Sequence, residues 1–121
     1  MGDVKVVRPR TAARKPAGDI SVGDVRNQTI VGDDVSAQHR VLDVAFTNGG
    51  RTKLHTHTTD QVLIIASGEG LVGTREERHR VGPGDVVFTP AGEPHFHGAA
   101  DGADMAHWAI VGAGNETTVV E

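Results

Sequence analysis

The apolar residues of this 121-residue chain fall into short runs, and most runs alternate with polar residues at a period of two. Residues 39–46 place Leu42, Val44 and Phe46 on one face of an extended strand, and residues 105–111 divide in the same way. Segments rich in turn-forming residues separate the runs, at residues 48–50, 67–70, 82–85, 90–92 and 100–102. This pattern predicts an all-β domain, either a β-sandwich or a closed barrel.

Further strands are predicted at residues 4–7, 25–31, 61–66, 70–74, 78–81, 86–89 and 93–98. Residues 62–66 are continuously apolar, which predicts that this strand is buried on both faces. The chain has 16 glycines, and none of its segments has the apolar spacing of an amphipathic helix. Its length predicts one domain, which we place at residues 19–121 after a basic arm at residues 1–18.

Composition excludes several classes of function. The chain has no cysteine, so disulfides, thiolate metal sites and a cysteine nucleophile are excluded. The net charge of -4 and a pI of about 5.9 argue against a nucleic-acid partner. The longest apolar run, residues 62–66, is too short to cross a membrane, and no apolar region of a secretory signal follows the basic arm. We therefore expect a cytoplasmic protein with a small-molecule partner.

Histidine is the residue type that points to chemistry. His55 and His57 flank Thr56, and His95 and His97 flank Phe96. Residues i and i+2 of a strand point to the same face, so each pair can direct two imidazoles at one point. A third histidine from the distant second pair and the amide oxygen of Gln61 would complete a donor set of three nitrogens and one oxygen. Such a set suits Mn, Fe, Ni, Cu or Zn.

The alternative is that these histidines are ordinary surface or core residues. Two His-x-His pairs beside turn glycines favour the metal site, whereas His39 and His79 lie among charged residues and are predicted to be solvated. His107 lies on the predicted strand at residues 105–111, on the same face as Ala109 and Val111. This face favours a place for His107 in the pocket over a purely structural role.

Two segments carry a family resemblance. The pattern Gly49-x5-His55-x-His57-x3-Gln61-x6-Gly68 resembles the first cupin motif, with glutamine where glutamate is most common. The pattern Gly84-x5-Pro90-x-Gly92-x2-His95-x3-Ala99 resembles the second, with alanine where asparagine is common. The resemblance implies a double-stranded β-helix, or jelly-roll barrel, with a metal inside its mouth. Position by position, it implies the ligands His55, His57, Gln61 and His95, and makes His97 a pocket residue.

The chain is also similar to small cupins related to carboxymuconolactone-decarboxylase-type proteins, some of which are manganese-dependent hydroxynitrile lyases. Those enzymes use three histidines and one glutamine as ligands, with further histidines that His97 and His107 match here. Val111 stands where the lyases have a polar residue. The resemblance implies one divalent metal per chain, with Mn²⁺ favoured and Fe²⁺, Ni²⁺ or Zn²⁺ as alternatives. It also implies a homodimer or homotetramer, in which the strand at residues 4–7 would cross between subunits.

Glutamine in place of glutamate removes one negative charge from the metal ligands, so a divalent ion would be a stronger Lewis acid and less prone to oxidation. This favours a redox-neutral lyase of small hydroxylated or carbonyl compounds, with His107 and His97 moving the proton. A dioxygenase and a non-catalytic binding protein are the alternatives. The side chains predicted to line an apolar substrate pocket are Leu42, Val44, Phe46, Leu54, Leu63, Phe88 and Val111.

Overall fold

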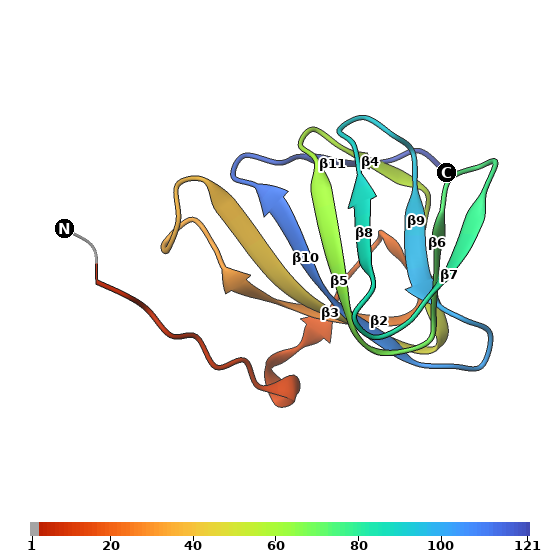
Figure 1. Ribbon diagram of the computed structural model, residues 1–121, viewed down its shortest axis with the longest axis horizontal. Helices are drawn as coiled ribbons and strands as arrows, with labels where there is room; N and C mark the ends of the chain where they lie inside the picture. The colour runs from red at the N-terminus through yellow and green to blue at the C-terminus, as the bar shows by residue number, and fades with distance from the viewer. Residues whose placement is uncertain (1–2) are drawn as a thin grey trace.

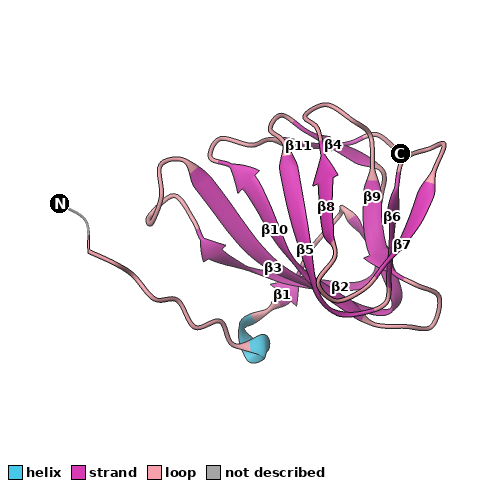
Figure 2. Cartoon of the chain, in the orientation of Figure 1, coloured by secondary structure: helices cyan, strands magenta, loops and turns pink. Residues whose placement is uncertain are grey.

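The computed structural model describes residues 3–121, and nearly all of its regular structure is β-strand. Figure 2 shows a single helical turn, η1, before the strands begin. The elements in chain order are η1 (Thr11–Ala13), β1 (Lys15–Pro16), β2 (Ser21–Val31), β3 (His39–Thr52), β4 (His55–His57), β5 (Gln61–Gly68), β6 (Gly70–Gly73), β7 (Arg78–Val81), β8 (Val86–Thr89), β9 (Phe96–Ala99), β10 (Met105–Gly112) and β11 (Thr117–Val119). The predicted all-β class is confirmed.

The strands form one curled antiparallel sheet in the order β7-β6-β9-β3-β10-β5-β8, with β2 paired to the long strand β3 and β1 paired to β2. A second, small sheet pairs β11 with β4. Figure 1 shows the main sheet wrapped around an interior, with β4 and β11 across one end. Across residues 3–121, no helix is long and apolar enough to span a membrane.

The period-two alternation produces the core. On β3, Val44 and Phe46 are buried, and on β10 the alternating residues from Met105 to Val111 are buried. These side chains pack against Val25 and Ile65 from neighbouring strands. Because every second residue points inward, the same rule directs His107 of β10 into the interior beside this core.

The prediction that residues 61–66 are buried on both faces is wrong. Gln61, Leu63 and Ile65 are buried, whereas Ile64 is 36% exposed and Ala66 is also exposed. The neighbouring strand β8 shows the same outward exposure, with Phe88 at 61%. A continuous apolar run fits a strand with two covered faces, but here one antiparallel sheet curls around a single interior and the outer face stays uncovered.

The predicted strand at residues 4–7 does not form within the chain, and its valines are exposed. Figure 1 shows this segment leading away from the body. Its alternating valines satisfy the strand pattern, but they pair with no strand among the described residues 3–121. The arm is attached further along, where Arg14 donates two hydrogen bonds to the buried Asp43 at 2.8 and 3.0 Å, and Gln28 donates a third.

The prediction of a turn at Asn48-Gly49-Gly50 is wrong, because β3 continues through this segment to Thr52. Asn48 and Gly49 have φ angles of 49° and 76°, and the register of β2 against β3 shifts at this point. A shift of this kind bends a strand and increases its twist without ending it. The bend lets one long strand follow the curved wall into the segment that precedes His55.

Gly68 is required where β5 ends. Its φ is +81°, and a Cβ atom there would lie 1.9 Å from the backbone oxygen of Asp104. We expect Gly68→Ala to lower the free energy of unfolding by about 3 kcal/mol. Alanine is disfavoured at a left-handed φ, and its Cβ would also clash with the backbone of Asp104. The matched control is Gly114→Ala, which has a similar φ of +80° but open space, and which should lose only about 1 kcal/mol. Equal losses in urea denaturation of the two variants would contradict this account.

Candidate metal centre

The two His-x-His pairs meet because the chain pairs backbone to backbone at His55 and His95. Each residue donates its N–H to the other's carbonyl oxygen at 3.0 Å. The ring centroids of His55 and His95 are therefore 4.3 Å apart, and the ring of His57 lies 4.8 and 5.0 Å from them. Gln61 opens β5 with its side chain buried beside the same rings. Segments forty residues apart thus form one cluster.

Backbone oxygens fix the protonation of two of these rings. The Nδ1 atoms of His55 and His95 lie 2.7 and 2.8 Å from the carbonyl oxygens of Lys53 and Glu93. A carbonyl oxygen only accepts hydrogen bonds, so each Nδ1 carries the proton and each Nε2 presents a lone pair. Metal-binding histidines are held by outer partners in the same way.

His57 is held by the C-terminal strand. Its Nδ1 lies 3.0 Å from Thr117 Oγ1, with the side-chain nitrogen of Asn115 at 3.3 Å, and its Nε2 is buried without a hydrogen-bond partner. When Nδ1 donates to Thr117, Nε2 offers a third lone pair to the cluster. A buried nitrogen without a partner is unfavourable in the protein alone, so this atom calls for a ligand.

The contact between Gln61 and His95 also calls for a cation. The Oε1 atom of Gln61 lies 3.2 Å from His95 Nε2. With the His95 proton held on Nδ1, two acceptor atoms face each other with no proton between them. A divalent ion held by Gln61 and His95 would relieve this repulsion, because it would be attracted to both lone pairs. The donor set therefore fits a metal ion.

Burial keeps the cluster uncharged. Burial lowers the pKa of His55 to about 4, and burial together with the neighbouring rings of His55 and His95 lowers the pKa of His57 to about 4. The pKa of His95 is lowered for the same main reason. Neutral imidazole is the form that binds metals, so the cluster is ready to bind an ion at neutral pH.

His97 and His107 form a second, deeper layer. His107 Nε2 lies 3.1 Å from His97 Nδ1, and both rings are buried. Burial lowers the pKa of His107 to about 4 and holds that of His97 well below its ordinary value. One proton is shared along this contact, and His97 Nε2 is left buried without a partner. The pair can therefore hold or pass a proton next to the metal ligands.

Three of these histidines have ring nitrogens within 4.8 Å of one another, namely His55, His95 and His97, so His97 also lies within reach of an ion at this site. Its Nδ1 differs from those of the other rings, because its partner is the imidazole of His107 and not a backbone or hydroxyl oxygen. His39 and His79 are exposed, as predicted. The cluster is a candidate metal site. Two arrangements are possible, because either His57 or His97 could join His55 and His95 as the third histidine ligand.

The histidine cluster opens into an interior cavity of about 370 Å³, which we call the mouth cavity. Leu42, Val44 and Val111 line it, together with His55, His57, Gln61, His97 and His107. The ring of Phe46 is buried 5.2 Å from that of His107, as part of the core behind this layer. Three predicted pocket residues are thus brought together with the histidines, and Phe46 supports them from behind.

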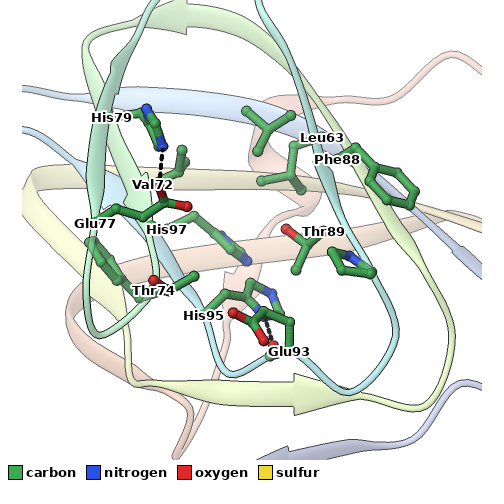
Figure 3. A pocket seen from close by; sticks show the side chains of 14 residues that line it. Leu63, Val72, Thr74, Glu77, His79, Phe88, Thr89, Glu93, His95 and His97 are labelled. Carbon is green, nitrogen blue, oxygen red and sulfur yellow. Dashed lines mark hydrogen bonds and ion pairs between the residues drawn. The ribbon is translucent and has the colours of Figure 1, made fainter.

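The other three predicted pocket residues lie elsewhere. Leu54 lines a separate cavity beside Arg51 and Arg78. Leu63 and Phe88 line a cavity on the β8 side, where Leu63 is buried and Phe88 is mostly exposed at its rim (Figure 3). The register that pairs Phe88 with Val62 turns its ring to the outer face of the sheet.

Sequence reasoning missed the residues that support the histidines. Thr117 and Asn115 hold His57, and the hydroxyl of Thr52 accepts the backbone N–H of His97. No spacing pattern links residues 115–117 to His57. The link is the pairing of β11 with β4, which sets Thr117 opposite His57.

The comparison with known proteins gives the family. A family model for the cupin domain matches residues 42–112. This chain belongs to the cupin family. It is 38% identical over 112 residues to an (R)-mandelonitrile lyase from Granulicella tundricola, a match that covers 89% of this chain and 82% of the relative.

Solved structures agree on the barrel. This cupin is similar to a cupin-like protein from Thermotoga maritima, with a TM-score of 0.75, 28% identity, and coverage of 91% of this chain and 80% of the other. The polyketide cyclase RemF from Streptomyces resistomycificus has a TM-score of 0.77 at 16% identity, over 97% of this chain and 87% of its own, which shows a shared fold alone. The predicted jelly-roll barrel is confirmed.

Proposed function

We propose that this cupin is a divalent-metal-dependent lyase that cleaves the carbon–carbon bond of a cyanohydrin bearing an apolar or aromatic group. The observation that carries the proposal is the buried donor set of His55, His57, Gln61 and His95, of which the first three line the mouth cavity together with aliphatic side chains. Similarity to an (R)-mandelonitrile lyase supports the substrate class. Mn²⁺ is the favoured ion, and when bound it would supply Lewis-acid chemistry at the substrate oxygen.

The chain itself positions the substrate. Leu42, Val44 and Val111 present aliphatic surface to the mouth cavity, where an aryl or alkyl group is removed from water. Histidines line the same cavity, so the hydroxyl of such a substrate would face the imidazoles while its apolar group faces the aliphatic side chains. Neutral ligands leave the positive charge of the ion uncompensated, because Gln61 contributes no charge where a carboxylate would.

His97 and His107 handle the proton. The substrate hydroxyl gives its proton to the unpartnered Nε2 of His97, whose Nδ1 is already in contact with His107 Nε2. As the C–O bond becomes a carbonyl, the bond to the nitrile carbon breaks and its electron pair leaves with cyanide. Cyanide takes the proton back from His97 and departs as hydrogen cyanide. The products are one aldehyde or ketone and one hydrogen cyanide, with no net oxidation.

The test is elemental analysis of protein purified without added metal, followed by a cleavage assay on racemic mandelonitrile. We expect bound manganese or another divalent metal, and release of benzaldehyde and hydrogen cyanide that stops when a chelator removes the metal and returns when it is restored. A fully metal-free protein that gains no activity with any divalent ion would contradict the proposal. Oxygen consumption with Fe²⁺ and no cyanohydrin cleavage would favour a dioxygenase instead.

A further inference from the structure

The curled sheet has an open side. Strands β7 and β8 are its two edges, and within residues 3–121 they are not paired with each other. A cavity of about 330 Å³ lies along this gap, which we call the seam. Val72 and Thr74 line one side of the seam, and Val87 and Thr89 of β8 line the other. The main sheet is therefore open at its side as well as at its mouth.

The seam leads to the histidine cluster. His95 and His97 line it, and Figure 3 shows their rings between the strand that carries Phe88 and the side that carries His79 and Glu77. His97 also lines the mouth cavity. The histidine cluster thus lies between two cavities, the seam and the mouth cavity, and both cavities extend to it.

The two routes differ in chemistry. The mouth cavity has the larger share of aliphatic residues and no carboxylate in its lining. The seam, beside apolar residues such as Leu63 and Phe88, carries the acids Glu77 and Glu93 together with Thr74, His79 and Thr89. Glu77 Oε2 lies 3.5 Å from His79 Nε2, and Glu93 is a second acid on the same route. Two carboxylates disfavour the entry of a small anion, while hydroxyls and carboxylates form hydrogen bonds with a neutral polar molecule.

We propose that the seam is a second passage to the histidine cluster, which carries a small neutral polar molecule while the mouth cavity holds the apolar part of the substrate. The assignment of that molecule as hydrogen cyanide rests on the proposed function. Cleavage creates two products of unlike polarity at one point, and the apolar product fills the mouth cavity. A separate polar route lets hydrogen cyanide leave before the carbonyl product has moved.

The absence of cysteine from the chain allows each route to be closed chemically. Single variants Val87→Cys and Thr74→Cys place a thiol on opposite walls of the seam, and Val119→Cys places one in the mouth cavity as the matched control. Each variant is compared before and after coupling to benzyl methanethiosulfonate. The probe is diethyl pyrocarbonate, a small neutral reagent for imidazole, applied to the metal-free protein and read by mass spectrometry against the exposed His39.

Coupling at residue 87 or 74 is expected to slow modification of His95 by about tenfold. His95 lines the seam and not the mouth cavity, so the reagent then needs a local opening of the fold. Coupling at residue 119 should leave that rate unchanged and slow modification of His57. Loss of His95 reactivity on coupling at 119, with no effect at 87 or 74, would overturn the proposal.

The same labelled variants separate the passage from the proposed reaction. If cyanohydrins are cleaved, coupling at residue 87 should lower kcat and KM together and leave kcat/KM nearly unchanged, because the release of a product is slowed. If no cyanohydrin is cleaved, the labelling of the metal-free protein still decides whether the seam is a passage, and only the assignment of hydrogen cyanide fails.

Discussion

Replacing His57 with alanine is expected to remove the metal, whereas replacing His97 with alanine should leave it bound. His57 has an outer hydroxyl partner on Nδ1 and a buried, unpartnered Nε2, as a ligand requires, whereas the Nδ1 of His97 is in contact with His107. We expect His57→Ala to weaken divalent-metal affinity by more than about 100-fold. Cyanohydrin cleavage should then fall by about 1,000-fold or more, since the Lewis acid is lost.

The measurement is metal content per chain after dialysis, with circular dichroism to check that each variant is folded. His39→Ala is the matched control, because His39 is exposed and lies outside both the cluster and the seam. His97→Ala should retain the metal and still lose activity, since the proposed mechanism uses His97 to move the proton. Metal retained in His57→Ala but lost in His97→Ala would show that His55, His95 and His97 hold the ion instead.

The metal-free protein is expected to lose much of its stability as the pH falls from about 6.5 to 4. Burial lowers the pKa values of His55 and His107 to about 4, and burial with neighbouring rings does the same for His57, while the unfolded chain titrates near 6.5. Between these values the unfolded state binds more protons, so stability falls with falling pH, and it is fully present only above the unfolded value.

At pH 5 each such histidine should reduce the free energy of unfolding by about 2 kcal/mol relative to pH 7.5, and three together approach the whole stability of an ordinary domain. Urea denaturation of chelator-treated protein at several pH values measures this loss. His39→Ala should not change the profile, because His39 is exposed. Stability that stays constant from pH 7.5 to 5 would mean that the buried rings are already charged or solvated.

Local sequence rules predicted most of the features that depend only on residues close together in the chain, such as which side chains of a strand face inward. Strand alternation placed Leu42, Val44, Phe46 and His107 on inward faces, since it needs only that side chains alternate along an extended chain. The same rule could not tell whether the outer face of a strand is covered. The prediction for Ile64 was therefore wrong, and the strand predicted at residues 4–7 does not form within the single chain, because both depend on what lies across from them.

The order of residues alone determined that His55 and His57 share one face, that His95 lies in a second such pair, and that cysteine chemistry is excluded. The tertiary structure alone decided that these pairs meet. The His55–His95 backbone pairing joins two segments that are distant in the chain, and no local sequence pattern says that they lie side by side. It also decided that Thr117 supports His57 and that β7 and β8 remain apart. Alternation is a local property of the backbone, whereas strand order and closure result from burying one interior with the whole chain.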